Sequence, residues 1–390
     1  MPARLGDMDV AYDAPGLQAC RRALRQHLAA SATDDDTRAA GAGARGLRVG
    51  FSGGPDSFAL LAAACAEELN PVAVIVDHGL HPEHAAITAA AAERAEALGA
   101  AVEIHAVGAA VAARRATGVG EEAAAREARY AAFAAAGCAI AVAHTADDQA
   151  ETWLLGALRG HATGMQAVSR RGSLLIHRPL LGIRRADTHA VATELSYRGA
   201  PVELFSDPTN LDPTYRRGAL RTQVLPALHD TVGSDPIPQL AAAAEQAAAA
   251  DAAIGEWAAP LVRAALQPTA DAGAGAPGMV GCAVAELPGR RAGLPEDFLV
   301  RAALDVAAVD PLPEVVCARV IRDIMVALGA APTQAAVAAA VAQIRRWRGQ
   351  GAVAVGRGSG GHSERLAVAR IRGKLVFASP PRDMSRIPHV

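Results

Sequence analysis

A glycine turn near the start of the chain carries residues that can bind an anion. Residues 49–64 read VGFSGGPDSFALLAAA, so apolar residues lead into SGGPDS (52–57) and a helical apolar pattern leads out. This order predicts a strand, a tight turn and the start of a helix. The glycines let the backbone approach an anion closely, and Ser57 and the first helical amides can donate hydrogen bonds to it. The turn predicts a phosphate or pyrophosphate site, the alternative being a structural turn in which Asp56 caps the helix.

A second polar pair, Asp77 and His78, follows the apolar run PVAVIV (71–76). Open α/β sheets bind their ligands at the carboxyl ends of the strands. The pair is therefore a candidate part of the same site, and a polar surface loop is the alternative.

A cluster of acidic residues suits a divalent cation. The stretch AHTADDQAET (143–152) begins with His144 at the end of an expected strand and enters a helix, where Asp147, Asp148 and Glu151 lie within one turn. Acids this close repel each other unless a cation, backbone amides or a helix dipole offset their charge. A Mg²⁺ ion bridging these acids and the phosphates of ATP would do so. Helix capping by solvated acids is the alternative.

Two pairs of arginines are candidates for contacts with phosphates or RNA. Arg126 and Arg129 lie in GEEAAAREARY (120–130), and Arg217 and Arg221 share one face of a predicted helix. Arginine is a fixed, bidentate cation, and pairs at this spacing can straddle a phosphodiester backbone. For the first pair the alternative is a plain helix in which Arg126 pairs with Glu122. For the second pair it is a solvated helix face.

The distribution of charge is more informative than its sum. The 390 residues carry a formal net charge of −2, which gives no global sign of a nucleic-acid partner. Between Arg159 and Arg221, however, ten arginines stand against five acids. This segment is a candidate phosphate-binding patch. Arginine is common along the whole chain, however, because Lys374 is the only lysine.

No segment indicates a membrane span, a disulfide framework or a metal–thiolate site. Apolar runs are interrupted before the roughly 18 residues that a span needs, and the first residues lack the apolar core of a signal peptide. The five cysteines are scattered without any CxxC pair. We therefore expect a cytoplasmic protein with buried, inert thiols and no membrane partner.

Alternating strand and helix patterns predict the frame that positions these residues. Strand-like stretches lie at 47–52, 71–79, 102–107 and 139–145, and alanine-rich helical stretches begin near residues 57, 85 and 121. Alternation of this kind predicts an α/β fold with a doubly wound parallel sheet, covered by helices on both faces.

After about Arg221 the pattern becomes helical. It is interrupted by a glycine–alanine–proline loop at 268–278, expected to be a mobile insertion, and it ends in a strand-like tail, ERLAVARIRGKLVFA (364–378). The expected divisions are an N-terminal extension with a first helix (1–46), the α/β domain (47–226), a mainly helical domain (227–330) and a small C-terminal segment with strands (331–390).

Taken together, these motifs resemble those of the N-type ATP pyrophosphatases, the PP-loop superfamily, and within it the family of tRNA(Ile)-lysidine synthases. The order SGGxDS, DHxL, GxExxARxxRY, AHxxDDQAET, RPLL and DPxN…YxR…R runs through residues 47–226 at that family's spacing, and the helical remainder matches loosely. SGGxDS identifies the superfamily, and AHTADDQAET with RPLL and DPTN points to this family.

The resemblance implies an ATP-dependent ligase that modifies RNA. ATP would activate the C2 oxygen of the wobble cytidine in the CAU anticodon of tRNA(Ile) as an adenylate, releasing pyrophosphate. Free L-lysine would then attack C2 through its ε-amine and expel AMP, so that the tRNA reads AUA instead of AUG. Because the pKa of free lysine is about 10.4, a carboxylate is expected as base, with Asp147 as the first candidate. The second half would recognise the body of the tRNA, and the family precedent is compatible with a homodimer.

The resemblance also assigns roles by position. The implied catalytic residues are Asp56, His144, Asp147, Asp148 and Glu151. The implied ATP-binding residues are Ser52, Gly53, Gly54, Pro55, Asp56, Ser57, Asp77 and His78. The implied tRNA or phosphate contacts are Arg126, Arg129, Arg217 and Arg221, and the implied cofactors are ATP and Mg²⁺, the metal being held by Asp56, Asp148 and Glu151.

Some positions depart from the family's pattern. His81 stands where arginine usually follows DHxL, which bears on an ATP contact, and Gly218 stands where asparagine usually follows YxR, which bears on a backbone contact to tRNA. The segment 160–172 is less rich in glycine and leucine than expected.

Other functions fit parts of the pattern. The nearest is another PP-loop enzyme, a tRNA thiolase, which would typically carry cysteine pairs. A small-molecule amide ligase such as a GMP synthetase would need an ammonia supply, and a non-catalytic nucleotide- or RNA-binding module would lack the acidic helix. The phosphate loop GxxxxGKS/T is excluded because the turn has no lysine, and GxGxxG does not fit it.

Overall fold

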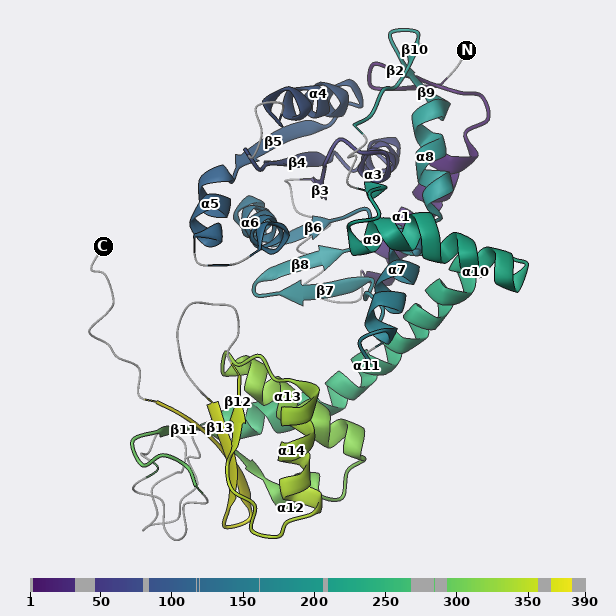
Figure 1. Ribbon diagram of the computed structural model, residues 1–390. Helices are drawn as coiled ribbons and strands as arrows, with labels where there is room; N and C mark the ends of the chain where they lie inside the picture. Colours follow the sequence, from purple (N-terminus) through teal and green to yellow (C-terminus); the bar gives the residue numbers. More distant parts are fainter. Residues whose placement is uncertain are drawn as a thin grey trace. The chain divides into compact units, whose positions relative to one another are not determined.

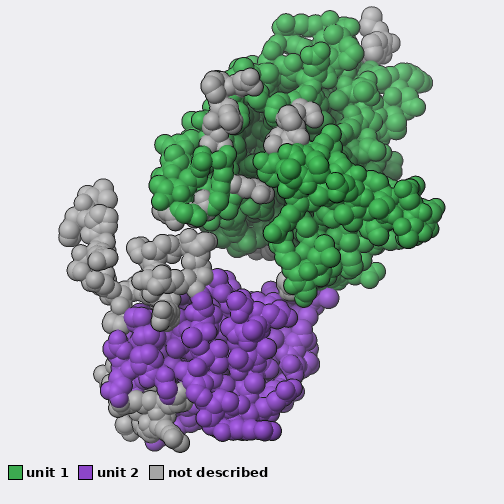
Figure 2. Space-filling view, viewed as in Figure 1, with its two compact units in different colours: residues 1–249 green, residues 250–390 purple. Residues whose placement is uncertain are grey.

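The computed structural model divides the chain into two compact units, residues 1–249 and 250–390 (Figure 2). The residues that it describes are 3–31, 46–79, 84–116, 118, 120–160, 162–205, 210–267, 284, 293–356 and 366–380. The expected loop at 268–278 lies outside them. The division falls inside helix α11 (Ile237–Leu266), at a different place from the boundaries expected after residues 46, 226 and 330.

A six-stranded sheet forms the frame of unit 1 (Figure 1). Its strand order is β5-β4-β3-β6-β8-β7, and all neighbours run parallel except β7 and β8. The strands are β3 (Arg48–Gly50), β4 (Val72–Asp77), β5 (Ala101–Ala106), β6 (Ala139–Ala141), β7 (Val168–Arg171) and β8 (Leu174–His177). The four strands expected from the sequence are the contiguous set β5-β4-β3-β6, so the predicted doubly wound sheet is confirmed.

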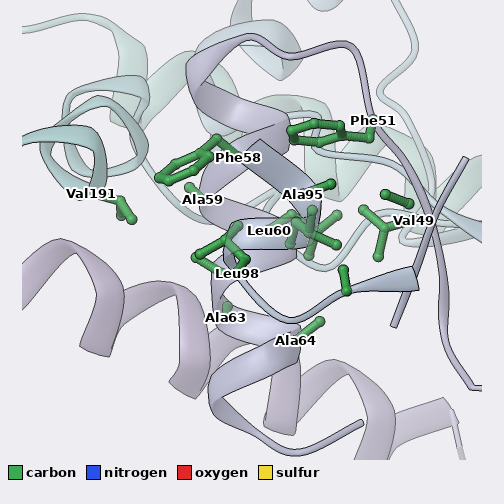
Figure 3. Close-up of a cluster of buried hydrophobic side chains, with 14 of the residues drawn as sticks. Val49, Phe51, Phe58, Ala59, Leu60, Ala63, Ala64, Ala95, Leu98 and Val191 are labelled. Atoms are coloured by element: carbon green, nitrogen blue, oxygen red, sulfur yellow. The ribbon is translucent and has the colours of Figure 1, made fainter. Parts of the chain in front are cut away.

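Helices cover both faces of this sheet. They are α1 (Pro15–Ser31), α3 (Pro55–Ala66), α4 (His84–Ala97), α5 (Gly108–Arg115), α6 (Glu121–Ala136), α7 (Ala146–Ala157) and α8 (Arg185–Glu194). On one face, Phe51 and Phe58 lie in a core that α3 shares with α1, α4 and α8 (Figure 3). On the other face, Tyr130 and Phe133 of α6 pack against Val74. The alanines of α3 let it lie close to its neighbours, and residues 57–64 are all buried.

A small antiparallel sheet and further helices complete unit 1. The sheet has the order β1-β2-β9-β10. These strands are β1 (Ala3–Leu5), β2 (Met8–Val10), β9 (Leu195–Tyr197) and β10 (Ala200–Pro201), and the helices are α9 (Arg216–Ala219), the π-helical η2 (Leu220–Val224), α10 (Leu225–Val232) and the start of α11. Across the described residues of the whole chain, no helix is long and apolar enough to cross a membrane.

Unit 2 combines an antiparallel sheet of order β11-β14-β13-β12 with helices. Its elements are β11 (Leu299–Asp305), α12 (Val306–Val309), α13 (Glu314–Ala327), α14 (Gln334–Arg345), β12 (Val353–Val355), β13 (Leu366–Ile371) and β14 (Lys374–Ser379). The strands of the tail agree with the sequence pattern. Strand β11 does not, because it lies in a stretch expected to be helical. Its residues, LVRAALD, favour a helix locally, and pairing with β14 overrides that preference.

Candidate active site

The glycine turn joins the end of β3 to the first turn of α3. Gly53 has φ +77°, and an added Cβ there would lie 3.0 Å from the Cβ of Ala91, so conformation and space both favour glycine. Gly54 is the N-cap of α3 and Pro55 its first residue, and within the described chain no side chain caps this helix end. The first amides of α3 therefore remain available to an anion.

Two serine hydroxyls close the turn. Ser52 Oγ and Ser57 Oγ lie 3.2 Å apart, and Ser57 Oγ donates to the carbonyl oxygen of Gly54 at 2.9 Å. The backbone N–H of Ser52 also donates to Ser57 Oγ at 3.2 Å. These bonds hold the loop in shape across its full length, which preorganises it for a phosphate.

Two partly buried histidines flank the turn at the ends of the neighbouring strands. His78 follows β4 and His144 follows β6, and these strands lie on either side of β3. Asp77 accepts a hydrogen bond from Gly79 N at 2.9 Å and so shapes the loop that carries His78. Burial lowers the pKa of both histidines to about 4, so both are neutral near pH 7. Among the described residues, neither Nδ1 has a hydrogen-bond partner. Such atoms are normally paired, so a ligand can supply the missing partner at both strand ends.

Asp148 is fixed by the start of α7. Thr145 and Asp148 form a capping box, in which Thr145 N donates to Asp148 Oδ2 at 2.9 Å and Asp148 N donates to Thr145 Oγ1 at 3.4 Å. Burial by itself would raise the pKa of Asp148. The charge of Arg185 and the N–H of Thr145 outweigh it and hold this pKa below its ordinary value.

Two arginines balance the charge of Asp148 and Glu151. Arg185 donates to Asp148 Oδ1 at 2.7 Å and to Glu151 Oε1 at 3.1 Å. Arg221 donates to Glu151 Oε1 at 2.6 Å and to Glu151 Oε2 at 3.0 Å. Because Glu151 is 0% exposed, water contributes little to its stabilisation and the guanidinium groups must do so.

Asp56 faces the same arginine from the first turn of α3. Arg185 Nε lies 3.9 Å from Asp56 Oδ2, and Thr188 Oγ1 donates to Asp56 Oδ1. Burial raises the pKa of Asp56, although the Thr188 hydroxyl and the charge of Arg185 oppose the shift. Three carboxylates, those of Asp56, Asp148 and Glu151, therefore meet at one guanidinium beside the glycine turn.

Asp147 lies next to this cluster but has different partners. Its Oδ2 accepts a hydrogen bond from Arg184 Nε at 3.1 Å and from the backbone N–H of Arg185 at 2.8 Å. The second bond caps the first turn of α8, so Asp147 joins the starts of α7 and α8. The carboxylate thereby positions Arg185, and its role as a base stays a prediction.

The four arginines expected at phosphates separate into two groups. Arg126 and Arg129 are exposed on α6, and Arg217 is exposed on α9. Arg221 instead points to the carboxylates from η2, and π-helical turns of this kind are frequent at functional sites. The three exposed residues stay predicted phosphate contacts, and Arg221 belongs to the carboxylate cluster.

Sequence reasoning missed Arg184, Arg185 and Thr188 as site residues. The two arginines entered it only through the local excess of positive charge. Their place directly after the RPLL motif was the signal that could have identified them. The motif does not show their partner, because Asp148 lies 37 residues before Arg185 in the chain. Arg178 of the same motif is buried and donates to Gln166 O and Ser169 Oγ at 2.8 Å each, so it secures the β7–β8 hairpin.

Three other observations concern the expected site. An added Cβ at Gly218 would lie 1.9 Å from the carbonyl oxygen of Asp212, so asparagine does not fit this turn as it stands. His81 lies outside the described residues. Over the described ranges, no three His, Cys, Asp or Glu side chains are arranged to hold a metal ion by themselves.

Comparison with known proteins gives matches to both units. A family model described as a PP-loop domain matches residues 22–228, and a model described as a TilS substrate binding domain matches residues 304–376. Among solved structures, the U34-tRNA thiolase NcsA from Methanococcus maripaludis covers 58% of this chain and 77% of its own, at 16% identity and a TM-score of 0.38. That likeness is too remote to add to the assignment.

Curated relatives match along nearly their whole length. The tRNA(Ile)-lysidine synthase of Corynebacterium glutamicum is 36% identical over 96% of this chain and 99% of its own. The enzymes of the same name from Nocardia farcinica and Mycobacterium tuberculosis are each 37% identical, over 87% and 85% of this chain and 94% and 91% of their own. The chain therefore belongs to the tRNA(Ile)-lysidine synthase family of PP-loop, ATP-dependent ligases.

Proposed function

We propose that this chain ligates free L-lysine to C2 of the wobble cytidine in the CAU anticodon of tRNA(Ile), in the cytoplasm and at the expense of ATP. The cytidine C2 oxygen first attacks the α-phosphorus of ATP, and the bond to the β-phosphate breaks to release pyrophosphate. The lysine ε-amine then attacks C2, and the C2–O bond breaks to release AMP. The modified anticodon reads AUA instead of AUG. The names and coverage of the relatives support this reaction.

We assign the phosphates of ATP to the glycine turn. The assignment is supported by the uncapped amides of α3, the Ser52–Ser57 pair and the positive φ of Gly53. The unpartnered Nδ1 atoms of His78 and His144 lie at the adjoining strand ends, where the ligand can complete their hydrogen bonds.

The carboxylates offer the oxygen ligands that Mg²⁺ prefers. Mg²⁺ is usually bound through one or two carboxylates together with substrate phosphates and water, rather than by a complete protein cage. Asp56 meets this description best, since it adjoins the glycine turn and burial raises its pKa, which a nearby cation would reverse. Asp148 and Glu151 are the further candidates. Bound there, the metal would neutralise charge on the departing pyrophosphate.

We assign the lysine amine to the carboxylates of Asp148 and Glu151. Both already bind cationic side chains, those of Arg185 and Arg221, so an ammonium group has the chemistry to compete for them. A carboxylate next to the amine also favours loss of its proton at the moment of attack. Asp147 is the alternative base.

The observation that carries the proposal is the meeting of Asp56 and Asp148 at Arg185, directly beside the glycine turn. It supports our assignment of the ATP phosphates and of the lysine amine to one site. A homodimer stays a prediction that size-exclusion chromatography with light scattering can test.

Lysine incorporation tests the reaction. Purified protein with Mg²⁺, ATP and labelled lysine is expected to label a tRNA(Ile) transcript with the anticodon CAU and to leave one with UAU unlabelled. Asp148→Asn is expected to lower the rate about 10²- to 10³-fold, because a charge that acts in the transition state is lost. Asp187→Asn, an exposed acid on α8, serves as the control and should keep the normal rate. Equal labelling of both transcripts would contradict the cytidine assignment.

A further inference from the structure

Phe205 differs from the other phenylalanines of the chain in its exposure. All six phenylalanines lie among the described residues. Five of them are buried or partly buried in hydrophobic cores, namely Phe51, Phe58, Phe133, Phe298 and Phe377. Phe205 is 39% exposed. A single exposed apolar side chain is ordinary at a protein surface, so the surroundings of Phe205 must decide whether its ring has a role.

The backbone of Phe205 is bound to the glycine turn. Its N–H donates to the carbonyl oxygen of Gly53 at 3.2 Å. A Cβ added at Gly54 would lie 3.6 Å from the carbonyl oxygen of Phe205, so the contact extends over two residues of the turn. The ring is therefore carried by a residue that directly adjoins the turn to which we assign the phosphates of ATP.

The residues before Phe205 are fixed from two sides. From α4, Arg94 Nε donates to the carbonyl oxygen of Glu203 at 2.9 Å. Val202 and Leu204 pack in the core that α3 shares with its neighbours, whereas Glu203 and Phe205 are exposed. This alternation is typical of an extended segment, in which every second side chain points to the same side. The segment thus holds Phe205 in place with its ring directed away from the core.

We propose that the ring of Phe205 stacks on a nucleobase, which is either the adenine of ATP or the wobble cytosine. Ligand sites combine a few placed polar groups with apolar and aromatic side chains. Every base has a flat π face on which an aromatic side chain can stack. The glycine turn supplies the polar groups, and Phe205 supplies the ring beside them. The inference rests on the proposed function for the identity of the two ligands.

Both bases have to come close to the glycine turn in the proposed reaction. The adenine is joined through its ribose to the α-phosphate of ATP, and the C2 oxygen of the cytosine attacks that same phosphate. Each base therefore lies within the length of a nucleotide from the phosphates that the turn holds. Phe205 is the exposed phenylalanine at this place, which makes it a residue that contacts substrate.

Stacking on Phe205 contributes to binding and orientation. The side chain has no group that can transfer a proton, so it takes no part in the bond changes. A base fixed beside the phosphates has less freedom to lose before the reacting atoms are aligned. A change at Phe205 is therefore expected to weaken binding of the ligand whose base it stacks, and to leave the affinity for the other ligand unchanged.

Fluorescence tests the stacking directly in the full-length chain. Phe205→Trp combined with Trp153→Phe, Trp257→Phe and Trp347→Phe places the only indole at position 205. The two probes are α,β-methylene ATP with Mg²⁺, which cannot release pyrophosphate, and tRNA(Ile) with the anticodon CAU. Quenching by the nucleotide but not by tripolyphosphate assigns the adenine. Quenching by the tRNA but not by the same tRNA with an abasic wobble nucleotide assigns the cytosine. Binding of both probes without base-dependent quenching would overturn the stacking.

Binding measurements test the ring with matched variants. Phe205→Ala is expected to raise the Kd for the stacked ligand about 5- to 150-fold, and Phe205→Tyr, which keeps an aromatic ring, should retain the normal Kd. Tyr12→Ala is the control, at an exposed ring near the far end of α8, where Ala11 N donates to Glu194 O at 2.8 Å. Equal losses in Phe205→Ala and Phe205→Tyr, or an unchanged Kd for both ligands in Phe205→Ala, would overturn the proposal.

These outcomes are distinct from a failure of the proposed function. Binding and quenching do not depend on catalysis, so a chain that binds both probes and never incorporates lysine would refute the reaction and leave the quenching to decide the stacking. Normal lysine incorporation with unchanged Kd values in Phe205→Ala would refute the stacking alone. A chain that binds neither probe would refute the proposed function and the stacking together.

Discussion

Arg185 joins carboxylates that come from two different helices. It bonds Asp148 and Glu151 of α7 and lies 3.9 Å from Asp56 of α3. A planar guanidinium holds five donors in a fixed geometry and can serve several carboxylates at once, whereas an ammonium group is a compact charge with three donors on a flexible stem. The guanidinium groups of Arg185 and Arg221 balance the same carboxylates to which we assign Mg²⁺ and the lysine amine.

Replacing Arg185 tests this balance. Arg185→Gln leaves buried carboxylates with Arg221 as their main partner, and we expect unit 1 to lose about 3 kcal/mol of unfolding free energy. Urea unfolding followed by Trp153, the only tryptophan of unit 1, measures the loss in a Trp257→Phe, Trp347→Phe background. Arg216→Gln, an exposed arginine of α9, should lose almost nothing. Equal stability of the two variants would show that Arg185 does not balance the cluster.

At the scale of elements, the site is built where three helices begin. Asp56 lies in the first turn of α3, Asp148 in the first turn of α7, and Arg185 is the first residue of α8. Each helix start carries partial positive charge and backbone N–H groups without a partner inside the helix, which stabilise carboxylates and phosphates alike. The convergence explains how so many acids are tolerated in one buried place.

The turn before η2 limits what position 218 can hold. Gly218→Asn would place a Cβ 1.9 Å from Asp212 O, so the turn must shift, and we expect a loss of about 1–3 kcal/mol in the unfolding free energy of unit 1. Gly233→Asn is the matched control, because Gly233 has φ +73° at the end of α10 with nothing within 4 Å, a position that asparagine tolerates. Thermal unfolding of both variants measures the two losses of stability and compares them. An equally mild effect at both positions would contradict the close contact.

The sequence predicted the elements with local signals and missed those that depend on distant partners. The strand–turn–helix at 49–64 could be predicted because its glycines and apolar periodicity are local. Strand β11 was missed because its residues favour a helix until β14 pairs with them. Arg185 was missed for the same reason, since only the folded chain brings it to Asp148 and Asp56.

At the scale of the whole molecule, two units have their own cores. The core of unit 1 includes Phe51 and Phe58, and the core of unit 2 includes Ile321 and Phe377. The sequence suggested several boundaries from composition. The two compact units divide within α11, where a helix shows no change of pattern, and the expected domain boundaries stay predictions. Separate cores allow separate unfolding.

Ligand binding should stabilise the units unequally. In urea, Trp153 and the pair Trp257 and Trp347 report unit 1 and unit 2 separately when the other tryptophans are replaced by phenylalanine. Mg²⁺-ATP at about 100 times its Kd is expected to add about 2.7 kcal/mol to the unfolding free energy of unit 1 and nothing to that of unit 2. Equal shifts in both signals would indicate a single cooperative unit.

The cations at the candidate site are guanidinium groups, and the only lysine of the chain, Lys374, belongs to β14 in unit 2. An adenylated cytidine is an electrophile that any neutral amine nearby can capture, whereas guanidinium stays protonated and is a poor nucleophile. Charge balance by arginine therefore leaves unit 1 without a lysine amine that could compete with the free amino acid. In the proposed reaction, arginine at these positions therefore avoids a covalent crosslink between a lysine of unit 1 and the adenylated RNA.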